Sequence, residues 1–302
     1  MMFDFRFPTL EDRNWMVPIL SASGNRGSES AFGTLYLWRS VYSSEVFRYG
    51  DQMILYSGGP FRTYNMPIGG KEMPFDAIEA ILRDAKERGL PFKMWGITQD
   101  GVAELQKMYP ERFCYRFDRD NSDYLYDARD LIDLPGRKFH GKRNHLAQFC
   151  RGYDWSYEEI VPENFEDCLE IDRLWRESRT GKERDGVEGE TEAIKRAFEN
   201  YEALGLSGGL IRVKGRPAAF TVGEEINSEI FLIHFEKALD GYDGLYTAIN
   251  HEFAAHRLGG YKYVNREEDM GIEGLRKAKL SYHPAALLQK YLVTLKGEDG
   301  AS

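Results

Sequence analysis

Apolar and polar residues alternate over short stretches in the first part of the chain, and between these stretches they recur with a helical period. The alternation predicts strands at Glu45–Gly50, Gln52–Ser57 and Arg62–Pro67. Apolar residues spaced by three and four predict an amphipathic helix over Phe75–Arg88, which ends at a glycine, and Pro91–Gly96 is the next expected strand. The pattern then predicts a helix at Val102–Met108 and strands at Arg112–Asp118 and Asp123–Tyr126.

The second part of the chain repeats this order. Two helices come first, then a hairpin turned at Gly215, a third strand, a helix ended by glycines, and another strand. A last helix and a last strand follow. The expected elements are Asn164–Arg179, Glu190–Leu204, Leu210–Lys214, Ala218–Glu224, Ser228–Phe235, Gly244–Leu258, Tyr261–Asn265, Ile272–Leu280 and Leu287–Leu295.

Three antiparallel strands, a helix, a glycine and one more strand therefore occur twice. We interpret the repeat as a duplicated α/β (α+β) unit, in which a mixed, mostly antiparallel sheet is flanked by helices. Pro135 and Gly136 interrupt the pattern, so the boundary is expected within Asp127–Gly136. The predicted domains are residues 1–130 and 131–302, with the ligand site in the second.

Composition limits the classes of function. The chain has 302 residues, 42% of them hydrophobic, and a net charge of −9, which is typical of a globular protein and argues against binding of nucleic acid or membrane over the whole surface. No apolar run is long enough for a signal peptide or a membrane span. Its three cysteines are far apart, which fits a reducing compartment. We expect a cytoplasmic protein without stable membrane insertion.

Several common catalytic motifs do not occur in this sequence. It has no Gly-x-Ser-x-Gly elbow, no Walker loop and no Gly-x-Gly-x-x-Gly fingerprint after a strand. His251 and His256 are five positions apart, which places them about 140° apart around a helix. Two histidines that share a zinc ion on a helix need a spacing of four. No metal is therefore expected.

A cationic segment follows the predicted boundary. Leu134–Tyr153 contains no acidic residue, and it should form a helix whose buried side includes Phe139, Leu146 and Phe149. Such a helix can hold phosphates, and it can equally be a solvated connection between domains. The candidate phosphate ligands are Arg137, Lys138, Lys142 and Arg143.

A second candidate for phosphate binding is the turn from the strand that ends at Phe235 into the next helix. Backbone N–H groups at such a turn can hold a pyrophosphate, and glycines permit the close approach. Asp240 and Asp243 would repel phosphate if they pointed inward, and one of them could instead cap the helix. The candidate donor ligands here are Gly241, Tyr242, Gly244 and Leu245, with Phe235 at the substrate.

The densest polar cluster lies where the strand Tyr261–Asn265 ends. Asn265 and Arg266 are candidate substrate ligands, and Glu267, Glu268 or Asp269 could act as a general base. The same acids could instead be neutralised in a structural ion network. Lys279 and Tyr282, at the end of the following helix, are further catalytic candidates, because a lysine there can stabilise an oxyanion.

Two of these segments carry a family resemblance. Residues 136–149, with Arg137, Lys138, Lys142 and Arg143, and residues 265–279 resemble the carboxy-terminal domain family of phosphatidylglycerol lysyltransferases, and the similarity extends from about Phe32 to Pro284. The resemblance implies two tandem acetyltransferase-like (GNAT) domains. It also implies kinship with Fem-type aminoacyltransferases, whose Phe-Lys-x-x-Phe-like segment is similar to Lys279–Tyr282. In that comparison Lys279 stabilises the transition state.

The resemblance implies transfer of an acyl or aminoacyl group to an amine or hydroxyl acceptor. Two donors remain open, a coenzyme A thioester and an aminoacyl-tRNA. The turn at Gly241–Gly244 lacks the Arg/Gln-x-x-Gly-x-Gly/Ala pattern of coenzyme A users, since residue 246 is Tyr, and the membrane half of the lipid-modifying enzymes has no counterpart here. The alternative is a ligand-binding module that kept this fold without catalysis.

Overall fold

The computed structural model describes residues 2–69, 75–179 and 187–297, and the chain divides into two compact units. Unit 1 comprises Met1–Asp123, Glu268–Glu273 and Leu287–Ser302, and unit 2 comprises Tyr124–Glu267 and Gly274–Ala286. The sequence predicted one boundary near residue 130. In the structure the chain first changes unit at residue 123 and later returns to unit 1, so its last strand belongs mainly to the first unit rather than the second.

The sheet of unit 1 contains the strands expected from the alternating pattern. Its order is β1-β2-β3-β5-β12-β6, antiparallel where β1 meets β2 and β5 meets β12, and parallel where β3 meets β5. A short strand, β4, pairs with β2. The bounds are β1 Ser44–Tyr49, β2 Gln52–Ser57, β3 Thr63–Tyr64, β4 Ile68–Gly69, β5 Lys93–Thr98, β6 Phe113–Asp127 and β12 Ala286–Leu295.

Two sequence-based expectations for unit 1 were incomplete. The two strands predicted over 112–126 are one strand, β6, because backbone pairing with neighbouring strands continues through its polar middle. Helices α1 (Arg13–Ala22) and α2 (Phe32–Leu37) were not predicted, since α1 contains Pro18 and α2 is almost uniformly buried. The predicted helices are confirmed as α3 (Phe75–Glu87) and α4 (Gln99–Met108), and α3 buries Ile78 and Ile81 completely.

The strands of unit 2 continue the same sheet from β6, in the order β6-β11-β10-β9-β8-β7. All neighbouring strands in this part are antiparallel except β10 and β11, which run parallel over only three residue pairs. The first strand, β7, was not predicted. The bounds are β7 Trp155–Glu159, β8 Ser207–Val213, β9 Arg216–Asn227, β10 Ile230–Ala238 and β11 Tyr263–Asn265.

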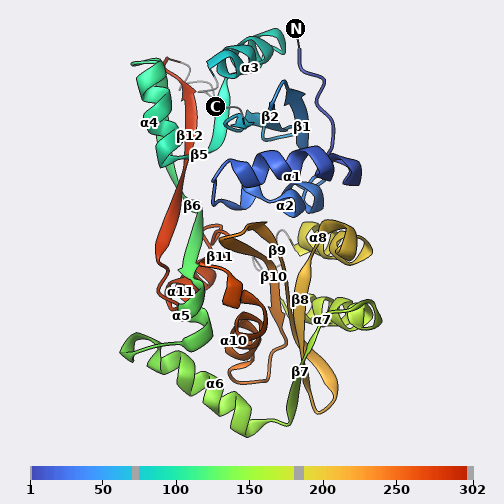
Figure 1. Ribbon diagram of the computed structural model, residues 1–302. Helices are drawn as coiled ribbons and strands as arrows, with labels where there is room; N and C mark the ends of the chain where they lie inside the picture. Colours follow the sequence, from blue (N-terminus) through green and yellow to red (C-terminus); the bar gives the residue numbers. More distant parts are fainter. Residues whose placement is uncertain (1, 70–74, 180–186, 298–302) are drawn as a thin grey trace. The chain divides into compact units, whose positions relative to one another are not determined.

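Helices cover both faces of this sheet (Figure 1). On one face Phe198 of α8 packs against Phe220 of β9, and on the other Phe253 of α10 packs against Phe231 of β10. Helix α6 packs on α10. Of the predicted buried side, Phe149 and the N-cap residue Phe139 are fully buried, whereas Leu146 is partly buried. The bounds are α5 Ala128–Asp133, α6 His140–Gly152, α7 Phe165–Glu177, α8 Val187–Glu199, α9 Tyr201–Leu204, α10 Leu245–Arg257 and α11 Glu273–Leu280.

Strands β10 and β11 separate after their short parallel ladder. The last pair is Leu232 with Asn265, after which β11 ends and β10 continues for six residues. A register shift between Ile233 and Phe235 marks a bulge in β10, and a bulge redirects the side chains around it. The carboxyl ends of the two strands therefore leave a gap in the sheet, and side chains of β10 and of the residues after Asn265 border it.

The N-cap residue of α10, Gly244, lies against α6. Gly244 has φ +84°, and a Cβ atom at this position would lie 2.4 Å from the backbone oxygen of His145. Gly241 has φ +90° but nothing within 4 Å of the corresponding position. The two glycines of this turn are therefore required for different reasons: Gly241 for its backbone conformation alone, and Gly244 also for helix contact.

This difference predicts unequal effects of two alanine substitutions. Gly241→Ala should lower the free energy of unfolding by about 1 kcal/mol, the cost of a positive φ. Gly244→Ala should cost roughly 2 kcal/mol more, because α6 must also move. Urea denaturation of both variants measures the difference. Equal losses of unfolding free energy in the two variants would contradict the close contact between α6 and α10.

Candidate functional site

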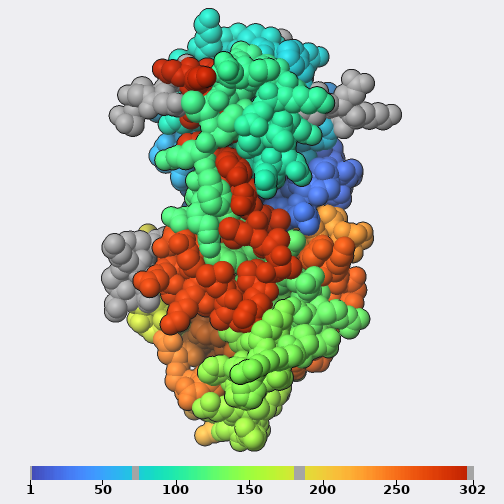
Figure 2. Space-filling model, turned by 90° about the vertical axis from the view of Figure 1, so that its left-hand side faces the viewer, coloured from blue at the N-terminus to red at the C-terminus, as the bar shows by residue number. Residues whose placement is uncertain are grey.

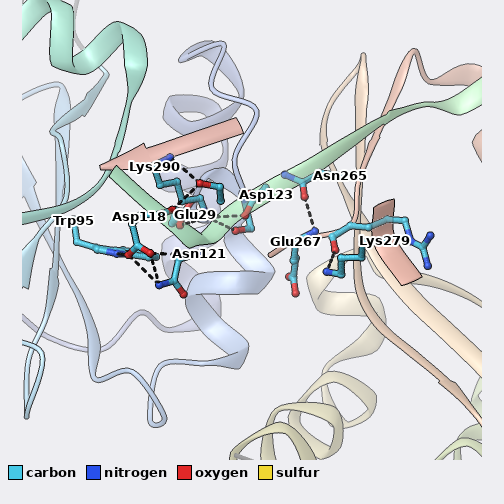
Figure 3. A network of polar contacts seen from close by, with 12 residues as sticks. Glu29, Trp95, Asp118, Asn121, Asp123, Asn265, Glu267, Lys279 and Lys290 are labelled. Atoms are coloured by element: carbon cyan, nitrogen blue, oxygen red, sulfur yellow. Dashed lines mark hydrogen bonds and ion pairs between the residues drawn. The ribbon is translucent and has the colours of Figure 1, made fainter. Parts of the chain in front are cut away.

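The backbone beyond β11 is held by side chains (Figure 3). Asn265 Oδ1 accepts a hydrogen bond of 2.7 Å from the backbone N–H of Glu267, whose φ is 54°. Lys279 Nζ donates to the backbone oxygen of Arg266 at 2.5 Å, and Tyr126 donates to the backbone oxygen of Lys279 at 2.8 Å. Asn265 and Lys279, expected to meet the substrate and the oxyanion, thus both hold this turn, and their roles toward a ligand stay predictions.

The three consecutive acids have different partners. Glu267 faces His234 of β10 in unit 2. Asp269 is fully buried in unit 1, where it pairs with Arg119 at 3.0 Å and accepts from the N–H of Gly271. Glu268 contributes to the negative surroundings that, with Asp123 and Glu29, raise the pKa of the buried Lys290 against the effect of its burial. The three acids that were expected to supply a base therefore belong to different units, and only Glu267 belongs to unit 2.

His234 lies between two carboxylates. Its Nε2 is 3.0 Å from Glu224 and its Nδ1 is 3.3 Å from Glu267, and the ring is buried. Burial opposes a charge on this ring, but the hydrogen bonds to the two glutamates outweigh it and raise the pKa of His234 to about 9. The imidazole is therefore protonated at neutral pH and anchors Glu267 to β10.

Arg266 occupies the gap between β10 and β11. Its Nη2 donates to Glu236 Oε1 at 2.8 Å, and Glu236 Oε2 accepts from Asn250 of α10 at 3.1 Å. The guanidinium carbon lies 4.8 Å from the ring centre of Tyr282 and 5.6 Å from that of Tyr126. Its Nη1 is buried and has no hydrogen-bond partner among the residues that the structure describes. A buried cation with an unused donor is the most polar feature of this gap.

Lys142 of α6 reaches the same ring. Its Nζ lies 3.7 Å from the ring centre of Tyr282. Partial burial, and then repulsion from Arg266, lower the pKa of Lys142 to about 8, while Glu236 acts in the opposite direction. Burial raises the pKa of Tyr282 to about 12, so its hydroxyl stays protonated at neutral pH. Two cations therefore contact one aromatic ring, and Glu236 is the carboxylate that acts on both of them.

A pocket of about 440 Å³ opens beside Lys142. Figure 2 shows the side of unit 2 on which the green segment containing α6 and the red segment containing α11 lie next to each other. The helices contribute mainly small and basic residues, so the pocket favours anions. Its lining residues are Lys138, Gly141, Lys142, His145, Gly274, Lys277, Ala278 and Ser281.

The predicted phosphate ligands of the cationic segment differ in what they contact. Lys138 and Lys142 line the pocket, and Lys138 also pairs with Asp130 at 2.7 Å. Arg143 donates to the backbone oxygens of Leu134 and Gly136, so it closes the loop before α6. Arg137 is exposed at the start of this segment. Lysines, rather than the arginines, carry the charge of the pocket.

The turn before α10 is occupied by protein contacts. His145 fills the space beside Gly244, Tyr242 packs against Tyr153, and Asp240 pairs with Arg179. No side chain caps α10, so neither Asp240 nor Asp243 has the predicted capping role. Leu245 and Phe235 are each 1% exposed, so their side chains belong to the core, and their roles toward a donor or substrate stay predictions.

Sequence reasoning missed His234, Glu236, Thr247, Asn250 and Tyr126. In β10 the apolar run is interrupted at His234 and Glu236, and polar residues inside a buried strand were an available signal. Thr247 and Asn250 are buried and three positions apart on α10, so they share its face toward the gap. Glu236 is the most informative omission, because it is the ion-pair partner of Arg266.

The described residues contain no group of three or more histidine, cysteine or acidic side chains that could hold a metal ion. His256 stacks on Tyr157, and His251 contacts Glu252. Within the same described ranges, no helix is long and apolar enough to cross a membrane.

Comparison with protein families confirms the resemblance. The family model described as "Phosphatidylglycerol lysyltransferase, C-terminal" matches residues 21–294. A conserved protein of unknown function from Bacteroides thetaiotaomicron is 38% identical with a TM-score of 0.93, and the match covers 98% of this chain and 100% of that chain. The structure of L-PGS from Bacillus licheniformis is 15% identical with a TM-score of 0.65 and covers 95% and 92% of the two chains.

A curated relative matches less fully. An uncharacterized protein from Mycoplasmoides gallisepticum is 23% identical over 176 residues, which is 57% of this chain and 56% of that protein. The chain thus matches about half the length of this relative.

The fold is that of tandem GNAT proteins. A tandem GNAT protein from the clavulanic acid biosynthesis pathway gives a TM-score of 0.51 at 12% identity, covering 96% of this chain and 98% of that chain. The crystal structure of FemX gives a TM-score of 0.59 at 10% identity, and the match covers 96% of both chains. The predicted fold class, two tandem GNAT-like domains with mostly antiparallel sheets, is confirmed, as is the fold kinship with a Fem-type protein.

The charge on His234 predicts a pH-dependent contribution to stability. The folded pKa of about 9 exceeds the usual 6.5, so the stabilisation is complete below about pH 6.5 and is lost as the pH rises through about 9. His234→Gln should therefore destabilise the protein more at pH 6 than at pH 9.5, by a difference on the order of 2 kcal/mol. Denaturant unfolding at the two pH values measures this difference.

The exposed His140 provides the matched control. His140→Gln should leave the free energy of unfolding nearly unchanged at both pH values. If His234→Gln lowered the free energy of unfolding equally at pH 6 and pH 9.5, the imidazole would stabilise the fold independently of its charge.

Proposed function

Because the chain belongs to the phosphatidylglycerol lysyltransferase C-terminal family, we propose that it transfers an acyl or aminoacyl group to an amine or hydroxyl acceptor, with unit 2 as the reacting unit. The observation that carries the proposal is the lysine-lined pocket, in which Lys142 lies near enough to Arg266 for the two charges to repel each other. A wall of lysines can hold the phosphates of a donor, and positive charge behind it can stabilise the reacting carbonyl group.

The contacts of the turn before α10 favour one of the two donors. A coenzyme A thioester needs a local cradle for its pyrophosphate, and the space beside Gly244 is filled by the backbone of His145. The pocket between α6 and α11 instead offers Lys138, Lys142 and Lys277 on an open surface. We propose aminoacyl-tRNA as the donor, bound through the phosphates near its acceptor end, and a cytoplasmic location, where this donor is made.

The transfer needs a proton acceptor and an exchange of bonds. The acceptor's nitrogen or oxygen forms a bond to the carbonyl carbon, the ester bond to the donor breaks, and the leaving oxygen takes a proton. Glu267 is the proposed base, because Asp269 is buried beside Arg119 and Glu268 lies in the surroundings of Lys290. Lys279 positions Arg266 through its backbone oxygen.

The proposal predicts salt-dependent donor binding through the outer lysines. Affinity for aminoacyl-tRNA should fall as the salt concentration rises. A plot of the logarithm of the binding constant against the logarithm of the salt concentration should have a slope of about −0.7 for each single-strand phosphate that is neutralised. The double variant Lys138→Met/Lys277→Met should therefore reduce the slope by about 1.4. Fluorescence anisotropy with labelled tRNA at several salt concentrations measures it, and transfer of a radiolabelled amino acid to amine and hydroxyl acceptors measures activity.

Lys262 provides the matched control, since it is an exposed lysine of unit 2 that lies 5.0 Å from a tyrosine ring outside the pocket. Lys262→Met should leave the slope unchanged. Tight binding of acetyl-coenzyme A with no binding of tRNA would overturn the proposed donor. Binding of tRNA with no transfer to any acceptor, unaffected by Glu267→Gln, would favour the inactive binding module.

A further inference from the structure

The gap between β10 and β11 holds a cation in a fixed position. Glu236 binds one terminal nitrogen of Arg266, Asn250 fixes Glu236, and the rings of Tyr126 and Tyr282 flank the guanidinium group. The side chain of Arg266 is 11% exposed. A buried donor without a partner is costly, on the order of 1–3 kcal/mol, so the unused Nη1 calls for an explanation.

Lys142 supplies the second cation. Its ammonium group and the guanidinium group lie 3.7 Å and 4.8 Å from the centre of the same ring, that of Tyr282. The charged groups around Lys142 do not neutralise it: Arg266 repels it, Glu236 is engaged with Arg266 and Asn250, and Lys138 and Lys277 line the same pocket. His145 is a further pocket residue. Arg266 and Lys142 therefore share one carboxylate, that of Glu236.

Of this pair of cations, Lys142 lines the pocket and Arg266 does not. Lys138 and Lys277 are exposed to solvent, while the side chain of Arg266 is mostly buried. A negative charge is stabilised far more strongly by fixed donors in a dry site than by exposed lysines. The exposed lysines are therefore suited to phosphates, and the mostly buried Arg266 is suited to a single anionic oxygen.

We infer that Arg266 Nη1 and Lys142 Nζ together bind one anionic oxygen, namely the carbonyl oxygen of the transferred group as it becomes negatively charged. Attack on the carbonyl carbon moves the π electrons of the carbonyl bond onto this oxygen. When the ester bond to the donor breaks, the same electrons re-form the carbonyl bond. This use of the site rests on the proposed function, whereas the binding of an anion does not.

The binding of an anion is tested on the full chain without any donor. Lysine labelled with ¹³C at Cε allows the protonation of Lys142 to be followed by NMR, and its signal is assigned from the spectrum of Lys142→Met. The titration midpoint is expected near pH 8 in sodium chloride. Inorganic phosphate at the same ionic strength should raise it by at least one unit, because an anion between the cations favours the charged lysine.

Variants separate the inner site from the outer lysines. The phosphate effect should persist in Lys138→Met/Lys277→Met and should fall at least threefold in Arg266→Lys, which keeps a charge but lacks Nη1. Circular dichroism verifies that each variant is folded. An unchanged midpoint with phosphate in the wild type, or an effect that disappears with the outer lysines, would overturn the inference.

Kinetics test the use of the site in transfer. Lys142→Met should lower kcat by about 10²–10³, the usual loss when one oxyanion donor is removed, while the Kd for the donor changes by less than threefold. Lys262→Met should change neither. A loss of donor affinity with kcat unchanged would make Lys142 a phosphate ligand and overturn the assignment.

The two arms keep the inference separate from the proposed function. If phosphate shifts the Lys142 titration as expected but no donor supports transfer, the proposed function fails and the anion site stands. If transfer occurs and Lys142→Met leaves kcat unchanged, the proposed function stands and the oxyanion assignment fails.

Discussion

The structure of unit 2 depends on how briefly β10 and β11 pair. Three parallel residue pairs hold the strands together, and the chain then leaves the sheet at Asn265. A buried backbone turn needs its polar groups satisfied, and Asn265, Lys279 and Tyr126 provide the hydrogen bonds. Without this early separation no space for Arg266 would exist, because a continuing ladder would fill the gap.

A second constraint is the close contact of α6 with α10. Gly244 allows the backbone of α6 to approach the start of α10, and this approach places Lys142 over the ring of Tyr282. The same contact brings the backbone of His145 against the turn before α10. The position of α6 therefore determines both what surrounds this turn and where Lys142 lies.

Much of the fold followed from periodicity, because strands and amphipathic helices leave patterns that do not depend on distant residues. The cationic helix and the polar end of β11 were also visible, since each is contiguous in sequence. What the sequence could not predict is which distant residues these polar side chains contact. Nothing near Arg266 in the sequence identifies Glu236, which is 30 residues away, and nothing in the run Glu267, Glu268, Asp269 shows that neighbouring acids join different units.

The hidden helices and the single strand β6 have a similar cause. Helix α1 contains a proline, and β6 continues through polar residues that isolated strands avoid, so tertiary pairing overrides local preference in both. At the predicted phosphate turn, the sequence showed the glycines but not their neighbours. Its glycines were real conformational requirements, but a glycine shows only that something lies close or that φ is positive, and it does not show whether the neighbour is a ligand or a helix.

The basic pocket lies in a chain of net charge −9, and this contrast affects how the protein binds anionic ligands. At physiological ionic strength charges are screened over about 8 Å, so the overall negative charge acts weakly on a ligand that already touches the lysines. At longer range it opposes non-specific binding of polyanions elsewhere on the surface. Affinity for anions is then concentrated at the pocket. The mostly buried Arg266 can add discrimination that exposed lysines cannot supply, because only a ligand group that enters the gap between β10 and β11 gains from its charge.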